Sequence, residues 1–193
     1  HDTDGSLLLT TSGGGVSNLF IKPADFQTIG LTSPRGLPTP ANTLRATDNG
    51  RGVWTGSSEG IGYYNAETNT YNPHAITLEG APEVTSIVAH GDELWIGTRH
   101  DGLIHYNTHT GEQKSYTYSP TVPYSLVSNS VNHIYRTRQG EIFVLTNWGF
   151  CKYNPSDDNF FSPMKISAHQ PFVTMTEDNA GRLWAATASR GIY

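Results

Sequence analysis

The sequence contains few residues of the kinds that build disulfide, redox or metal sites. Its single cysteine, Cys151, excludes an intramolecular disulfide and any Cys-x-x-Cys motif. We interpret this residue as a small buried side chain on a strand. The eight histidines do not cluster at metal-ligand spacing. The sequence therefore predicts no bound metal and no other cofactor.

Charge and long apolar runs are also scarce. Charged residues make up 15% of the chain, and the net charge of −5 contains no block of like charges, which excludes the basic footprint of a nucleic-acid-binding surface. No apolar run has the length of a transmembrane helix, and no stretch has helical periodicity. What the chain does have is 20 glycines and 11 prolines. This composition favours a turn-rich, all-β protein.

One short motif recurs along the chain and predicts its architecture. An aromatic residue follows a turn that ends in Gly, and a Ser or Thr comes two or three residues later. The four copies read Gly-Val-Trp-Thr-Gly-Ser (52–57), Glu-Leu-Trp-Ile-Gly-Thr (93–98), Glu-Ile-Phe-Val-Leu-Thr (141–146) and Arg-Leu-Trp-Ala-Ala-Thr (182–187), and a weaker fifth copy covers residues 6–11. The aromatic positions are 41, 48 and 41 residues apart. Repeats of this length made of short strands are typical of β-propeller blades.

The repeat around residues 84–116 predicts four antiparallel strands. We expect strands at 84–89, 94–98, 103–106 and 113–116, joined by Gly- and Asn-rich turns. The first strand is apolar throughout, so we expect it to be buried on both faces, and the fourth is polar, as a solvated edge requires. The ring of Trp95 and its equivalents should fill the space between neighbouring blades.

The turn residues have a structural interpretation. We expect Asp48 and Asp178 to shape the turns between first and second strands, and not to act as catalytic acids. The side chains of Asn65, Asn107 and Asn154 follow each third strand and should cap the next turn.

The chain as a whole is predicted to be one propeller segment, residues 1–193. Blades are expected at about residues 1–41, 42–83, 84–130, 131–171 and 172–193. The first lacks an innermost strand and the last ends before its outer strand, so two of the five blades are incomplete. Both ends would supply second and third strands and cannot complete one another, which predicts a segment of a longer propeller.

These repeats resemble the two-component regulator propeller repeat. Residues 93–98 with 102–107 follow that pattern nearly letter for letter, residues 125–134 resemble its connection into the next inner strand, and residues 177–184 repeat its turn and aromatic. Phe143 in place of Trp, and Leu145 in place of Gly, are departures in the fourth unit.

The resemblance implies a sensory role. Such repeats form the seven-bladed, extracytoplasmic part of membrane-bound hybrid histidine kinase regulators in glycan-degrading bacteria. It therefore implies a periplasmic segment of an inner-membrane receptor, an oligosaccharide ligand, further blades of the same propeller as partners, and a homodimeric receptor. The kinase and the membrane helix would lie in parts of the protein outside this chain, so the segment itself is not expected to be an enzyme.

Candidate ligand contacts come from the loops between second and third strands, which differ in sequence while their flanks repeat. We predict Trp148 as a platform for the C–H face of a sugar, and Arg99, His100, Asp101 and Arg190 as polar contacts to its hydroxyls. Exposed polar loops are also the ordinary state of an all-β surface.

Two other functions remain open from the sequence. A propeller-fold polysaccharide lyase is one, although no nucleophile elbow, phosphate-binding loop or paired-carboxylate motif is present. A protein-interaction scaffold is the other.

Overall fold

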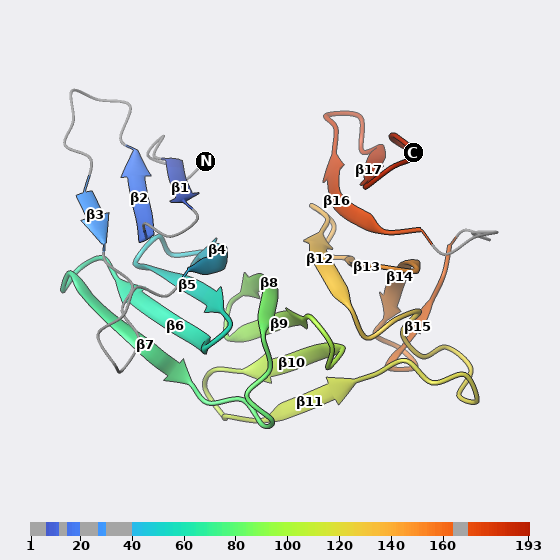
Figure 1. Ribbon diagram of the computed structural model, residues 1–193, viewed down its shortest axis with the longest axis horizontal. Helices are drawn as coiled ribbons and strands as arrows, with labels where there is room; N and C mark the ends of the chain where they lie inside the picture. Colours follow the sequence, from blue (N-terminus) through green and yellow to red (C-terminus); the bar gives the residue numbers. More distant parts are fainter. Residues whose placement is uncertain (1–6, 12–14, 20–26, 30–39, 164–169) are drawn as a thin grey trace. The chain divides into compact units, whose positions relative to one another are not determined.

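The computed structural model (Figure 1) describes residues 7–11, 15–19, 27–29, 40–163 and 170–193, and every regular element in these ranges is a β-strand. The chain forms two compact units, residues 1–91 and 92–193. Among the described residues there is no helix with the length and hydropathy of a membrane span.

Seventeen strands make up the described elements. The first unit contains β1 (Leu7–Thr11), β2 (Gly15–Leu19), β3 (Gln27–Ile29), β4 (Ala41–Ala46), β5 (Gly52–Ser57), β6 (Gly60–Asn65), β7 (Thr70–Ile76) and β8 (Val84–His90). The second contains β9 (Glu93–Thr98), β10 (Leu103–Asn107), β11 (Gln113–Tyr116), β12 (Val131–Arg136), β13 (Ile142–Thr146), β14 (Gly149–Asn154), β15 (Asn159–Phe161), β16 (Phe172–Glu177) and β17 (Leu183–Thr187). The strand orders are β1-β2-β3, β4-β5-β6-β7, β8-β9-β10-β11, β12-β13-β14-β15 and β16-β17. The predicted four-stranded repeat is confirmed in the sheets between residues 41 and 161.

Small residues let adjacent elements of the first unit approach closely. Strand β8 packs against β4 and β5. A Cβ atom added at Gly56 would lie 2.4 Å from Cγ1 of Val84 and 2.7 Å from Cγ2 of Thr43. Gly56 therefore lies where strand β8 approaches β5 closely, and a larger side chain would not fit there.

Burial along the strands differs in part from the prediction. Strand β8 is buried in five of its seven residues, as expected of a first strand, but β4, β12 and β16 are only partly buried. The most completely buried strands are β9 and β13, which are second strands. The prediction for the first strand of residues 84–116 is therefore confirmed, but it does not extend to β4, β12 and β16. Strands β9 and β13 are more buried because each lies between two hydrogen-bonded neighbours.

The repeated aromatic residues are not equally buried. Trp95 and Phe143 are 7% and 5% exposed, and Trp54 is half-buried. The Trp95 ring contacts the ring of Tyr153 on the next sheet of the second unit, 4.7 Å between centroids, which confirms that it fills space between sheets. Trp184 is 43% exposed, so the same prediction is wrong for that ring.

Single residues of the turns and of β14 behave mostly as predicted. The Oδ1 atom of Asn107 accepts hydrogen bonds from the amides of His109 and Thr110, 2.9 and 2.8 Å, and Asn65 and Asn154 accept in the same way. Asp178 Oδ1 likewise accepts from the amides of Ala180 and Arg182 in its own turn. Cys151 is fully buried, and this burial raises the pKa of its thiol to about 12.

The structure corrects the prediction that Asp48 shapes its own turn. Its Oδ2 atom accepts from the amide of Gly91 at 3.0 Å and lies 2.9 Å from Nδ1 of His90, so it binds the turn of the following repeat. The Gly91 amide is the main cause of the lowered pKa of Asp48. Its own turn is held instead by the side chains of Thr47 and Asn49.

Candidate functional site

The hydroxyl group that ends each second strand builds the loop that follows. Thr98 Oγ1 accepts from the amide of Asp101 at 2.9 Å and donates to the carbonyl of Gly102 at 2.8 Å. The same pair of bonds forms around Thr146 and Thr187. The Thr of the repeated motif therefore fixes the backbone of the loops on which the ligand contacts were predicted.

All five predicted ligand residues lie on these loops and are exposed. Arg99, His100 and Asp101 lie between β9 and β10, Trp148 between β13 and β14, and Arg190 after β17. The amides of Trp148 and Arg190 donate to the preceding Thr hydroxyls, 3.1 and 3.0 Å. That the five side chains share one ligand stays a prediction.

Trp148 has an aromatic neighbour that the sequence pattern did not reveal. The ring of Tyr118, on the segment between β11 and β12, meets the Trp148 ring edge to face, with centroids 5.6 Å apart and planes at 79°. Trp148 is 44% exposed and Tyr118 37% exposed. We call these two residues the aromatic pair. A Pro-rich segment next to Tyr118 was visible in the sequence, but its contact with Trp148 depends on how that segment folds.

Asn129 connects the aromatic pair with the loop of Arg99, His100 and Asp101. Its Oδ1 atom accepts from the amide of Tyr118 at 2.6 Å, and its carbonyl accepts from the amide of Gly102 at 2.9 Å. One asparagine therefore links the predicted loop of Arg99, His100 and Asp101 to the segment that carries Tyr118.

Further amides support the loop of Trp148. The Nδ2 atom of Asn147 donates to Ser130 Oγ at 2.8 Å, and Nδ2 of Asn132 donates to Oδ1 of Asn147 and to the carbonyl of Phe172, both at 3.0 Å. Asn147 directly follows β13, and Asn132 lies in β12. They hold the backbone beside the aromatic pair in one arrangement.

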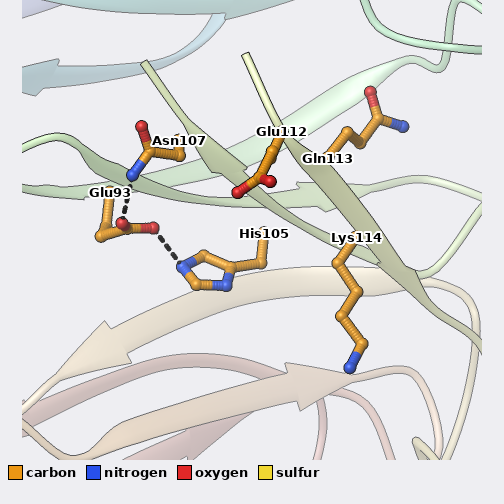
Figure 2. Close-up of a pocket in the computed structure, with 6 residues that line it drawn as sticks. All are labelled: Glu93, His105, Asn107, Glu112, Gln113 and Lys114. Carbon is orange, nitrogen blue, oxygen red and sulfur yellow. Dashed lines mark hydrogen bonds and ion pairs between the residues drawn. The ribbon is translucent and has the colours of Figure 1, made fainter. Parts of the chain in front are cut away.

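A pocket of about 490 Å³ lies on the sheet of β9, β10 and β11 (Figure 2). We call it the polar pocket. It is lined by Glu93, His105, Asn107, Glu112, Gln113 and Lys114. None of these residues was predicted as a ligand contact, because strand residues of a repeat read as scaffold.

The groups at the centre of the polar pocket are already paired. Glu93 Oε2 lies 2.6 Å from Nε2 of His105, and Glu93 Oε1 accepts from Nδ2 of Asn107 at 2.6 Å (Figure 2). The His105 ring stacks on Trp95, with centroids 4.1 Å apart and planes at 7°. His105 lies opposite Trp95 on the neighbouring strand, and in the next sheet Lys152 lies opposite Phe143 in the same way. Lys152 forms an ion pair with Glu141, as His105 does with Glu93. This recurrence favours a structural ion pair over a ligand site.

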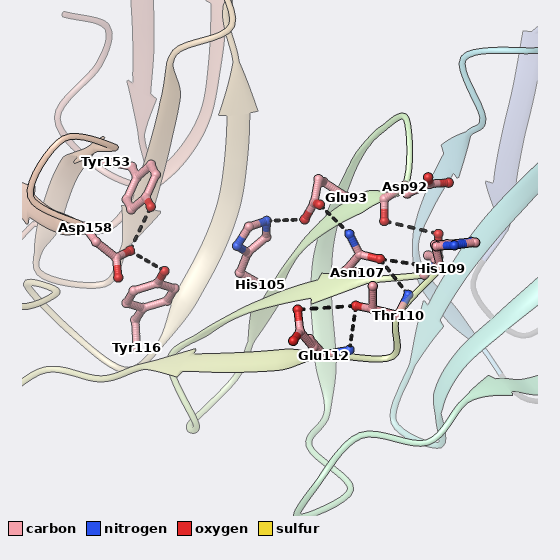
Figure 3. A network of polar contacts seen from close by, with 11 residues as sticks. Asp92, Glu93, His105, Asn107, His109, Thr110, Glu112, Tyr116, Tyr153 and Asp158 are labelled. Atoms are coloured by element: carbon pink, nitrogen blue, oxygen red, sulfur yellow. Dashed lines mark hydrogen bonds and ion pairs between the residues drawn. The ribbon is translucent and has the colours of Figure 1, made fainter.

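A second polar cluster lies beyond His105 (Figure 3). Asp158 Oδ1 accepts from the hydroxyls of Tyr116 and Tyr153, 2.6 and 2.7 Å, and Asp158 Oδ2 pairs with Lys114. Burial raises the pKa of the Tyr116 hydroxyl. A catalytic base needs a pKa near the working pH, so Tyr116 is unsuited to that role.

In the described part of the chain, no three His, Cys, Asp or Glu side chains gather closely enough to hold a metal ion. The one buried thiol, Cys151, has a raised pKa, which disfavours the thiolate that a nucleophile requires.

Comparison with known proteins locates the fold. No family model matches the sequence, and no curated protein matches it. Among solved structures, the extracellular domain of the putative hybrid two-component system BT3049 from B. thetaiotaomicron matches 99% of this chain at 19% identity, with a TM-score of 0.77. Two structures of the extracellular domain of BT4673 from B. thetaiotaomicron, described as a putative hybrid two-component and a putative one-component system, match 97% at 23% and 24% identity, with TM-scores of 0.75 and 0.76.

The chain has the fold found in these extracellular domains. It is all-β, with four-stranded antiparallel sheets of the propeller type, as the repeats predicted. The chain spans 25% of the BT3049 domain and 24% of the BT4673 domain.

Proposed function

We propose that this chain is a ligand-sensing, extracytoplasmic propeller segment of a hybrid two-component sensor and that it recognises an oligosaccharide. The observation that carries the proposal is the aromatic pair, held at the loop ends of sheets whose fold matches extracellular sensor domains over nearly the whole chain. Exposed aromatic faces, linked through Asn129 to a loop that carries Arg and Asp, suit a sugar, which presents both C–H faces and hydroxyls.

The same proposal covers the setting of the segment. The protein would be periplasmic and anchored in the inner membrane through parts outside this chain, with a kinase on the cytoplasmic side and a homodimeric receptor. The remaining blades of the propeller would be its partners in the same chain. The short share of the matched domains that this chain spans is consistent with such a larger assembly.

Binding of size-fractionated hexose, pentose and uronic-acid oligosaccharides, measured by titration calorimetry, tests the ligand class. We expect Trp148→Ala and Arg99→Ala to weaken binding by about tenfold or more each, as loss of a contact at the centre of an interface does. Both residues are exposed, so the free energy of unfolding should change by about 0.5 kcal/mol or less. Trp184→Ala and Arg51→Ala, at other exposed positions, are the matched controls.

The result also separates the alternatives. Unchanged affinity in both Trp148→Ala and Arg99→Ala would remove the site. Release of unsaturated sugars that absorb in the ultraviolet would identify a lyase, and binding without turnover supports the sensor.

A further inference from the structure

The segment between Tyr118 and Leu126 forms a closed loop. Ser125 Oγ accepts from the amide of Ser119 and donates to its carbonyl, both at 3.0 Å, and Tyr118 pairs with Leu126 in a parallel bridge. Leu126 is 1% exposed and anchors the end of the loop. The loop is therefore a compact surface element held at its base.

Tyr124 is held in this loop against its backbone preference. Its φ angle is +62°, in the left-handed region that a bulky residue rarely adopts. The preceding Pro123 restricts the chain before it, and the carbonyl of Tyr124 accepts from the amide of Phe160 at 2.8 Å. The surrounding contacts thus determine a conformation that local preference disfavours.

The constraint keeps the Tyr124 ring at the surface. The residue is 64% exposed, and its ring and hydroxyl have no aromatic or hydrogen-bonding partner among the described residues. Tyr118, one half of the aromatic pair, begins the same loop, and six residues of chain span at most about 20 Å. Three exposed aromatic rings, Tyr118, Tyr124 and Trp148, therefore belong to one loop and its immediate neighbour.

We propose that Tyr124 is a second aromatic platform for the oligosaccharide that the aromatic pair binds, so that the ligand is a chain of several sugar units. This inference rests on the proposed function. A rigid, exposed tyrosine contributes contact area with little loss of conformational freedom on binding. Its strained backbone is consistent with a position selected for contact rather than for stability.

Affinity as a function of ligand length tests this inference. The dissociation constants of a disaccharide and of a hexasaccharide from the best-binding series of the panel are measured for wild type, Tyr124→Ala, Tyr124→Gly, Tyr124→Phe and Trp148→Ala. Glycine adopts a positive φ freely, so Tyr124→Gly keeps the loop folded if Tyr124→Ala does not. We expect Tyr124→Ala and Tyr124→Gly to weaken hexasaccharide binding by about tenfold, as loss of one anchoring aromatic does. Both variants should leave disaccharide binding unchanged. Tyr124→Phe should bind both ligands as wild type does.

The outcomes distinguish this inference from the function on which it rests. If Trp148→Ala weakens both ligands while the Tyr124 variants bind the hexasaccharide as wild type does, Tyr124 is not a platform and the proposed function stands. Equal losses for both ligand lengths in the Tyr124 variants would also overturn the inference. If no oligosaccharide binds the wild-type protein, both proposals fail.

Discussion

Trp95 and Trp184 occupy the same place in the repeat, yet they meet different surroundings. Trp95 is 7% exposed and contacts three rings, those of His105, Tyr116 and Tyr153. Trp184 is 43% exposed, and its contacts are polar: its indole Nε1 donates to Asp178 Oδ2 at 3.0 Å, and the Arg182 guanidinium lies 5.7 Å from its ring.

The difference shows what the repeated motif encodes. The motif places a large ring on the second strand of each repeat. A turn precedes the ring, and a loop whose backbone is bound by a Thr hydroxyl follows it. Burial of that ring depends on the next sheet, which supplies Tyr153 for Trp95. Trp184 is held instead by a hydrogen bond to Asp178 in the preceding turn.

The largest expected effect comes from removing the buried ring. We expect Trp95→Ala to lower the free energy of unfolding by about 3–5 kcal/mol, because it leaves a large cavity between sheets. The same substitution at Trp184 should cost about 1 kcal/mol or less, because the ring is nearly half exposed. Urea denaturation followed by far-UV circular dichroism measures both. Equal losses would contradict the contrast between the two positions.

A smaller effect is expected from Asp158, whose carboxylate binds the hydroxyls of the two tyrosines that contact Trp95. Asp158→Ala removes the acceptor of two tyrosine hydroxyls and the partner of Lys114, so we expect a loss of about 2 kcal/mol. Asp158→Asn should cost less, about 1 kcal/mol, because asparagine keeps an acceptor and tolerates the φ of +52° found here. Chemical denaturation of both variants checks the order. A loss in Asp158→Asn as large as in Asp158→Ala would show that the charge, and not the acceptor, stabilises the cluster.

Local features of this fold could be predicted because they depend on residues close in sequence. The strands of residues 84–116 follow from β-branched runs and glycine turns, and the cap by Asn107 follows from its position after a strand. In both cases the deciding contacts lie within a few residues along the chain, so the pattern itself contains them.

Contacts between repeats could not be predicted in the same way. Asp48 binds Gly91, 43 residues away, because two turns of adjacent repeats meet. Tyr118 reaches Trp148 because an irregular segment crosses to the next loop, and no periodic pattern describes that segment. The residues that line the polar pocket occupy ordinary strand and turn positions of the repeat. Nothing in the sequence distinguishes them from residues with a purely structural role.

The smallest expected effect concerns the exposed ring and depends on pH. Hydrogen bonds from the Trp184 indole and the Arg182 amide lower the pKa of Asp178 to about 2, from an ordinary value of 3.8. A carboxyl group whose pKa is lower in the folded protein stabilises it above the unfolded pKa, and this stabilisation disappears as the pH falls through the folded value. We therefore expect wild type to be more stable than Asp178→Asn above pH 3.8, and the difference to vanish as the pH approaches about 2. Thermal unfolding between pH 2 and 6 measures the difference, and the NMR signal of the Trp184 indole N–H reports the titration directly. A midpoint near 3.8 for that signal would mean that the indole does not hold the carboxylate, and the polar account of Trp184 would then fail while the account of Trp95 would remain.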